Sequence, residues 1–263
     1  MKRMKSTVLL SVAAVLAAGS AFANTTIKDG VTGDGSLILD VVDTASQTSF
    51  TFDTGKTISS FNGNSSLTFD LSGDANWQAF IASTGASDTL TYNVVGVNTV
   101  NPTGWVLDGT SNAAAGTATG QLGSITNAQL KQISALNSFI NAVNSTTTNT
   151  ANSIFASAAT NNAAYVGASM SLGTEKITSG DLIGTPQGFY QWTLGPQPTN
   201  NLQKANIATF AGQWSLSKAG AFTYSAVPLP PGLALLLSGM ALTALIARRR
   251  SSGTGMVSMG AAA

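Results

Sequence analysis

Few residues of this chain have side chains of the kinds that catalysis or metal binding most often uses. The 263 residues include no histidine and no cysteine. Without histidine, the chain lacks Ser-His-Asp catalysis, histidine-ligated metals and the usual general base near neutral pH. Without cysteine, it lacks disulfides, thiolate nucleophiles and cysteine-ligated zinc. Any chemistry must therefore rest on carboxylates, hydroxyls and a few lysines.

One triplet, Asp53-Thr54-Gly55, has the local sequence that aspartic proteases carry. That chemistry needs two carboxylates sharing a proton, and the chain has no second Asp-Thr-Gly or Asp-Ser-Gly. The triplet is better explained as a polar strand end that enters a glycine turn. Gly55-Lys56-Thr57 resembles the end of a phosphate-binding loop, but Phe50 occupies the position of a required glycine. With Glu175 as its one glutamate and no recognisable acid pair, the chain is not predicted to be an enzyme. No catalytic, cofactor or metal site is assigned.

Four aspartates near residue 35 form the densest acidic region. Asp29, Asp34, Asp40 and Asp43 are interspersed with glycines 30, 33 and 35. Calcium sites use such oxygen ligands, which makes a calcium site an alternative. The spacing does not match the EF-hand loop, however, and Asp-Gly is common in hairpin turns. We therefore favour turns.

The four tryptophans allow two interpretations. Aromatic rings on one face can stack against sugars, and buried aromatic rings fill the core of a β-protein. Exposure of at least two on one face would favour a carbohydrate-binding module, whereas burial of all four would favour a structural protein. The residues are Trp77, Trp105, Trp192 and Trp214.

Charge is distributed unevenly along the chain. All four arginines lie in the end segments, together with Lys2 and Lys5. The middle of the chain keeps six lysines against eleven acids, a net charge of −5. Nucleic-acid phosphates require a basic surface, so this composition argues against nucleic acid as a partner.

The N-terminus has the three parts of a signal peptide. Basic residues up to Lys5 precede the apolar stretch Val8–Ala18, and small residues follow at Ala21 and Ala23. This order predicts a signal peptide over residues 1–23, cleaved by signal peptidase before Asn24.

The C-terminal region has the pattern of a membrane anchor. Val227, Pro228, Leu229 and Pro230 precede an uncharged stretch, Leu233–Ala247, which ends at Arg248, Arg249 and Arg250. A helix over residues 231–247 would span ~26 Å, near the lower limit for a bilayer, and snorkelling arginines extend its reach. The positive-inside rule places the arginines in the cytoplasm and the body outside.

These residues resemble the VPLP variant of the PEP-CTERM sorting signal, over residues 226–250. The resemblance implies processing by an exosortase-like membrane protease. It also implies an inner-membrane-anchored precursor that is later released or attached at the surface of a Gram-negative bacterium, often alongside exopolysaccharide. Two features depart from the usual pattern: Pro231-Gly232 stands where alanines are more common, and residues 251–263 continue past the arginines. We expect this tail to be unstructured.

The body, residues 24–225, is expected to form a single exported domain. Residues 37–42 form a mostly apolar run after a glycine-rich turn, and apolar residues alternate with polar ones over 50–53, 67–71 and 90–94; these patterns predict strands. Further strands are expected over 165–172 and 189–194, with a terminal hairpin over 214–224 around a turn at Lys218-Ala219-Gly220. Helical spacing is found over 126–143 and in a short segment capped by Ser72 or Asp74, whereas 144–162 is expected to be loop or weak helix.

These patterns predict a mainly β fold, an antiparallel β-sandwich with a short helical insertion. The function expected is that of a structural or interaction protein of the cell envelope or extracellular matrix. The alternative is a lectin-like carbohydrate-binding module.

Overall fold

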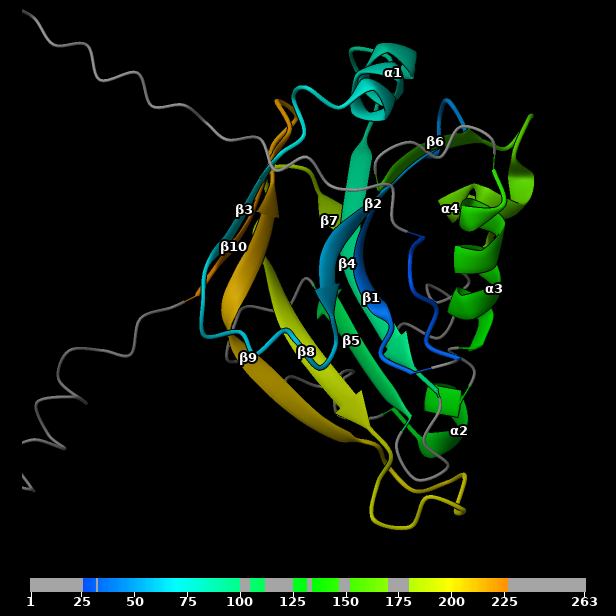
Figure 1. Cartoon of the computed structure of the whole chain (residues 1–263), viewed down its shortest axis with the longest axis vertical. Helices are drawn as coiled ribbons and strands as arrows, with labels where there is room; N and C mark the ends of the chain where they lie inside the picture. Colours follow the sequence, from blue (N-terminus) through cyan, green and yellow to red (C-terminus); the bar gives the residue numbers. More distant parts are fainter. Residues whose placement is uncertain are drawn as a thin grey trace, which may run out of the picture.

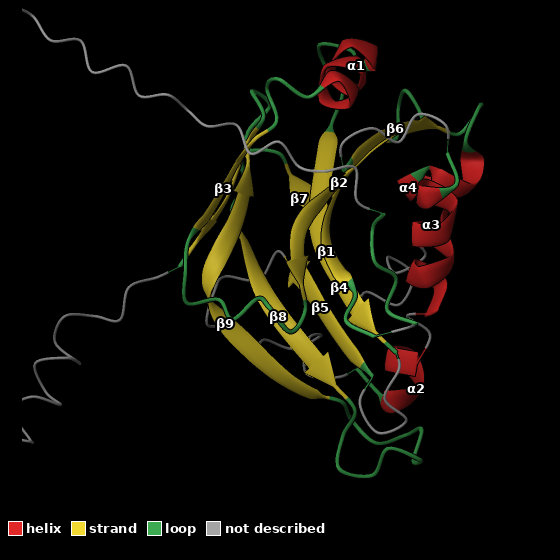
Figure 2. Ribbon diagram, in the orientation of Figure 1, coloured by secondary structure: helices red, strands yellow, loops and turns green. Residues whose placement is uncertain are grey.

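The protein folds around one antiparallel sheet (Figures 1 and 2). The computed structural model describes residues 26–31, 33–99, 105–111, 125–131, 134–146, 152–169 and 180–226. The strand order is β3-β10-β9-β8-β5-β4-β1-β2-β6, and β7 pairs with β4 beside this path. The strands are β1 (Ser36–Asp43), β2 (Thr48–Thr57), β3 (Leu67–Asp70), β4 (Leu90–Asn98), β5 (Val106–Ser111), β6 (Ser153–Ser157), β7 (Asp181–Leu182), β8 (Gln187–Thr193), β9 (Asn206–Leu216) and β10 (Ala221–Ser225). The helices are α1 (Ala75–Ser83), α2 (Asn127–Leu130), α3 (Ser134–Asn144), the 3₁₀ turn η3 (Asn162–Ala164) and α4 (Val166–Ser169).

The sheet curls, so its two faces bury different cores. In Figure 1 the strands β3, β10, β9 and β8 form one wall, and β5, β4, β1 and β2 form the other. The inner core lies between these walls and is closed at one end by Trp77 and Phe80 of α1. The outer core lies between the second wall and the helices α2, α3 and α4.

Strand β1 shows that both faces of the wall formed by β5, β4, β1 and β2 are buried. Leu37, Leu39 and Val41 belong to the inner core. Ile38 belongs to the outer core, and Val42 packs against it. A strand covered on both faces reads as a nearly continuous apolar run, and SLILDVVD fits that description.

Each core has its own composition. The inner core is aromatic, with Trp214 stacked on Phe222 at a centroid separation of 4.8 Å. The outer core receives one face of α3, whose apolar residues recur at the i, i+3, i+4, i+7 spacing of an amphipathic helix. These residues are Leu136, Phe139, Ile140 and Val143.

Side-chain caps fix the starts of the helices α1 and α2. The carboxylate of Asp74 accepts hydrogen bonds from the amides of Asn76 and Trp77, at 2.8 and 2.9 Å. Thr126 and Gln129 form a reciprocal capping box at the start of α2. Asp74 was one of two predicted caps for the first helix, and Thr126 was one of two for the second.

The mainly β, antiparallel prediction is confirmed, but the arrangement is one curled sheet and not the two stacked sheets of a sandwich. The strand predicted over 165–172 is wrong where the structure describes it, because α4 is helical. Ala164 and Val166 belong to the outer core, and the extended residue Tyr165 between them separates η3 from α4. The region expected to be loop or weak helix contains β6, which pairs with β2.

Within the described ranges, no helix combines the length and apolarity needed to cross a bilayer. The predicted signal peptide, the segment 231–247 and the tail 251–263 lie outside the described residues.

Candidate functional site

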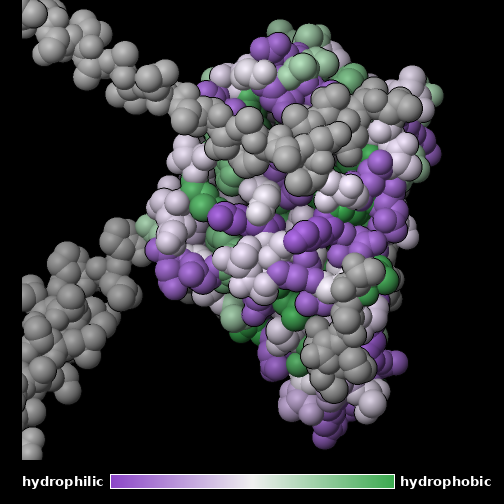
Figure 3. All heavy atoms as spheres, in the orientation of Figure 1, coloured by the Kyte–Doolittle hydropathy of each residue, from purple (hydrophilic) through white to green (hydrophobic). Residues whose placement is uncertain are grey.

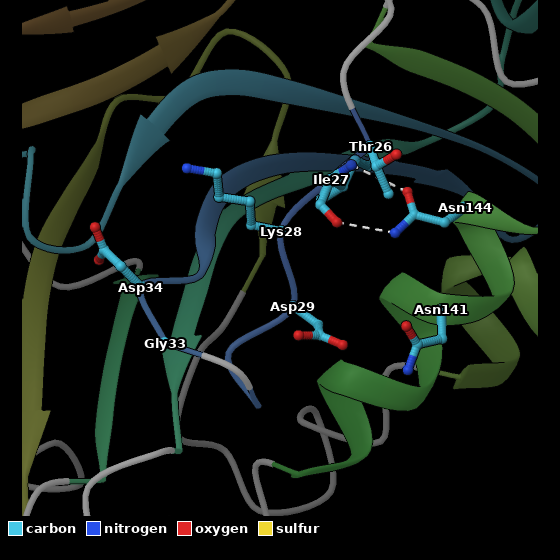
Figure 4. A pocket seen from close by; sticks show the side chains of 8 residues that line it. All are labelled: Thr26, Ile27, Lys28, Asp29, Gly33, Asp34, Asn141 and Asn144. Carbon is cyan, nitrogen blue, oxygen red and sulfur yellow. Dashed lines mark hydrogen bonds between the residues drawn. The ribbon is translucent and has the colours of Figure 1, made fainter.

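A shallow pocket of about 420 Å³ lies between the segment preceding β1 and helix α3 (Figure 4). Its lining combines one ammonium group, two carboxylates and two amides with small residues. The lining residues are Thr26, Ile27, Lys28, Asp29, Gly33, Asp34, Asn141 and Asn144.

Hydrogen bonds from α3 fix the position of the segment before β1, which forms one side of the pocket. The Asn144 side chain accepts from the Ile27 amide at 3.0 Å and donates to the Ile27 carbonyl at 2.8 Å. The amide of Gly30 donates to the Asn137 side-chain oxygen at 2.9 Å. Ile27 is itself buried in the outer core. The Asn144 amide is therefore a structural group, although it lines the pocket.

The charged groups divide between the two sides of the pocket. In Figure 4 Lys28 extends toward the side of Asp34, whereas Asp29 and Asn141 lie on the side of α3. Burial raises the pKa of Asp34, but hydrogen bonds from Ser59 and Thr57 and the charge of Lys28 outweigh it and leave that pKa below its ordinary value. Both oxygens of Asp34 accept from Ser59, so this carboxylate is already engaged. Asp29 accepts from the Val31 amide at 3.3 Å, and Asn141 lies near it on the side of α3.

The side chains of the protease-like triplet form hydrogen bonds within β1 and β2. Asp53 accepts from the Ser36 hydroxyl at 3.2 Å and from the Gly55 amide at 2.9 Å. The Thr54 hydroxyl donates to the Leu37 carbonyl at 2.7 Å, and Gly55 has a φ of 66°. Burial raises the pKa of Asp53. None of its partners in the described chain is a carboxyl group, so the second acid of a dyad is not in place.

The structure does not bring the four clustered aspartates together. Asp40 lies in the middle of β1, and Asp43 accepts from Ser46 at the β1–β2 turn. Asp34 is bound to Ser59, and Asp29 lines the pocket. Across the described ranges, no three acidic side chains converge as metal ligands would. These four aspartates therefore do not form the cluster of oxygen ligands that a calcium site requires.

Two buried acids, Asp40 and Asp108, were not anticipated as such. The Thr51 hydroxyl donates to one oxygen of Asp40 at 2.7 Å, and the other oxygen has no hydrogen-bond partner among the described residues. Its cross-strand neighbour Asn93 has a buried, unpartnered side-chain oxygen as well. Burial raises the pKa of Asp40 to about 7. The apolar residues on both sides of Asp40 in the sequence were the signal that could have indicated the burial of its side chain.

Asp108 repeats this arrangement on the inner face of the sheet. Gln191 donates to one of its oxygens at 3.0 Å, and the other oxygen has no described partner. Burial raises the pKa of Asp108 to about 7 as well. The two acids lie on opposite faces of the sheet, so they do not form a catalytic pair.

The aromatic residues do not form an exposed platform in the described chain. Trp77, Trp192 and Trp214 are buried, and Trp105 is half-buried against the outer core. On the face shown in Figure 3, hydrophilic and hydrophobic residues are interspersed without a broad apolar patch. Comparison with family models, curated proteins and solved structures found no match. The predicted targeting residues, Ala21, Ala23, Asn24, Val227–Pro230 and Arg248–Arg250, lie outside the described ranges.

Proposed function

We propose that this chain is an exported structural or interaction protein of the cell envelope or extracellular matrix, sorted through its C-terminal PEP-CTERM-like signal. The observation that carries the proposal is the order of three parts near the C-terminus: the Val-Pro-Leu-Pro motif, the apolar stretch and the arginine cluster. β10, the last strand of the described chain, ends at Ser225, and the motif starts at Val227, two residues later. This spacing suits a folded body followed directly by a sorting signal.

The body supports a non-enzymatic role. Asp53 and Asp34 hydrogen bond within the fold, and three of the four tryptophans fill the two cores. The partners proposed are signal peptidase at Asn24, an exosortase-like protease at Val227–Pro230 and the membrane through residues 231–247. Exopolysaccharide is the proposed surface partner, and nucleic acid is not proposed.

Exchanging Pro228 and Pro230 for alanine tests the sorting step. A simple anchor needs only apolar length and flanking charge, so it would be processed or retained regardless of these prolines. A protease that reads an extended approach to the membrane depends on prolines, because they fix φ. In a host with an exosortase, we expect the double variant to insert normally and accumulate as precursor on an immunoblot of membrane fractions.

A matched control carries Pro196→Ala and Pro198→Ala in the loop between β8 and β9, and we expect it to be processed like the parent. Neutral substitutions at Arg248–Arg250 should weaken orientation and retention. Normal processing of the Pro228/Pro230 variant would contradict the sorting proposal. N-terminal sequencing of the exported protein should begin at Asn24, and a sequence beginning at Met1 would contradict export through a cleaved signal.

Carbohydrate binding is a second candidate because of the pocket in Figure 4. Asp29 and Asn141 offer the carboxylate and amide groups that hydrogen bond sugar hydroxyls, although no aromatic ring is among the residues that line the pocket. Titration with neutral oligosaccharides, followed by amide NMR shifts, tests this candidate. Shifts confined to residues 26–34 and α3, and lost in Asn141→Ala, would support it. Shifts absent at millimolar sugar would exclude it.

A further inference from the structure

Three polar side chains form a row across the outer face of the sheet, on three adjacent strands. In the strand registers, Asp40 of β1 lies directly opposite Thr51 of β2 on one side and Asn93 of β4 on the other. Ile38 and Val42, two positions before and after Asp40, both pack in the outer core, so alternation places the Asp40 side chain on the same face. Side chains directly opposite each other in an antiparallel pair have Cβ atoms ~5 Å apart, which allows contact.

The hydrogen bonds of this row stop at its middle residue. The Thr51 hydroxyl donates to Oδ1 of Asp40 at 2.7 Å. Oδ2 of Asp40 and Oδ1 of Asn93 are both buried, and neither has a hydrogen-bond partner among the described residues. Buried polar atoms of native proteins are nearly always hydrogen bonded. Two unpartnered acceptors on directly opposite residues therefore call for a donor between them.

A proton on Asp40 supplies this donor. An ionised carboxylate only accepts hydrogen bonds, whereas a protonated carboxyl group has one O–H donor. With its proton on Oδ2, Asp40 can donate to Oδ1 of Asn93 while Oδ1 of Asp40 still accepts from Thr51. The pKa of Asp40 agrees with this arrangement, because burial raises it to about 7 against the opposing effect of the Thr51 hydrogen bond.

No charged group of the described chain is placed to keep Asp40 ionised. The elements α3, η3 and α4, which lie over this face, contain no charged residue, and neither do β4 and β6. The charged residues of β1 and β2 are Asp40 itself, Asp43, Asp53 and Lys56. Asp43 is three positions from Asp40 and so on the opposite face, and Lys56 is near the far end of β2. Asp53 is the nearest on the same face, and another anion cannot favour ionisation.

We propose that Asp40 retains a proton below neutral pH and donates it in a hydrogen bond to Asn93, so that one proton links β1 to β4 under the helices of the outer core. Loss of this proton at alkaline pH leaves an anion opposite an acceptor oxygen in a buried site, which weakens the junction between the two strands. The outer core thus contains a pH-sensitive contact. This inference does not depend on the proposed function.

A double-mutant cycle tests the direction of the hydrogen bond. Asp40→Ala, Asn93→Ala and the double variant are compared with the parent by urea unfolding of the full chain in detergent micelles, at pH 5 and pH 9. At pH 5 we expect the coupling between the two side chains to raise the folding equilibrium constant about fivefold. At pH 9 the factor should fall to one or below, because both groups are then acceptors.

The pair of Asp40 with Thr51 is the matched control, with Thr51→Val as the substitution that removes the hydroxyl. Thr51 donates to Asp40, and a hydrogen bond to an ionised acceptor is stronger than one to a neutral acceptor. This coupling should therefore grow between pH 5 and pH 9, opposite to that of Asn93. If Asn93 instead turns its NH₂ group toward Asp40, its coupling will grow as well, and the proposal is overturned. Absence of coupling between Asp40 and Asn93 at pH 5 also overturns it.

Carbon-13 NMR of the unsubstituted chain supplies a measurement that requires no variant to fold. We expect the carboxyl carbon of Asp40 to titrate with a midpoint near 7, and the side-chain amide of Asn93 to shift with the same midpoint. Asp70 serves as the control, because hydrogen bonds from Ser72 lower the pKa of its exposed carboxyl group. An Asp40 carboxyl that is ionised throughout the range from pH 5 to pH 9 would refute the proposal, and so would an Asn93 amide that does not shift.

Hydrogen exchange measures the consequence for the two strands. Asp40→Asn keeps a donor opposite Asn93 at every pH, because its NH₂ group takes the place of the O–H. Between pH 5 and pH 9, we expect the protection factors of the β1 and β4 amides to fall about tenfold further in the parent than in Asp40→Asn. An equal fall in both proteins would show that the proton on Asp40 does not control this junction.

Discussion

Replacing Asp40 by asparagine should stabilise the protein at pH 8 and reduce its pH dependence. Burial raises the pKa of this carboxyl from 3.8 to about 7. Between about pH 4 and pH 7 the folded protein therefore keeps a proton that the unfolded chain has released. The free energy of unfolding falls as pH rises through this window, and the loss is complete above pH 7.

The size of the effect follows from the shift. One pKa unit corresponds to ~1.4 kcal/mol, so a rise from 3.8 to about 7 corresponds to an upper limit of roughly 4 kcal/mol above pH 7. Most of this loss, about 3 kcal/mol, falls between pH 5 and pH 8. Asparagine resembles the protonated acid, because its oxygen can still accept from Thr51 and its amide can donate to the unpartnered oxygen of Asn93.

Urea unfolding at pH 5 and pH 8 measures this prediction, with the buried tryptophans as the fluorescence probe. The parent should lose stability between the two pH values, and Asp40→Asn should lose markedly less; Asp108 accounts for the remainder. Asp70→Asn is the control, because hydrogen bonds from Ser72 lower the pKa of that exposed carboxyl. The reasoning fails if the parent is equally stable at both pH values, or if Asp40→Asn depends on pH as strongly as the parent does.

Three further substitutions test the packing and the caps by thermal unfolding. Asp74→Ala removes the acceptor for two amides of α1 and should cost ~1 kcal/mol. Phe139→Ala empties a buried site between α3 and the sheet and should cost about 3–5 kcal/mol, whereas a negligible loss would show that the outer core is loose. Gly212→Ala would place a methyl group 2.3 Å from the Tyr224 ring and 2.6 Å from the Ser225 carbonyl, so it should destabilise by more than about 1 kcal/mol. Its control, Gly73→Ala, meets no atom within 4 Å and should be tolerated.

Local patterns in the sequence predicted the strands that alternate regularly and the helices with clear caps. They could not show that the hairpin strands join a single sheet, because that depends on pairings such as β5 with β8, about 80 residues apart. β6 was missed for a similar reason. Its Ser-Ile-Phe-Ala-Ser sequence follows a polar stretch, and it becomes a strand by pairing with β2. Tertiary contacts overrule weak local propensity in such segments.

The site was less predictable than the fold. Asp40 and Asp43 are close in sequence, but they are three positions apart on β1, and alternation sends their side chains to opposite faces. The pocket, in contrast, joins Asp29 to Asn141 across more than 100 residues of chain. No spacing rule connects these two residues, and only the packing of α3 on the sheet brings them together.

The place of β10 in the sheet has a consequence for the order of folding. This last strand lies between β3 and β9, and it pairs Phe222 with Phe69 across about 150 residues of chain. A chain that emerges N-terminus first therefore carries β3 without its neighbour until nearly the whole body has appeared. Contacts between such distant segments form slowly, and a strand that stays unpaired during this time is prone to aggregation. The curled sheet is thus completed by the residues immediately before Val227, and closure of the fold coincides with arrival of the C-terminal motif.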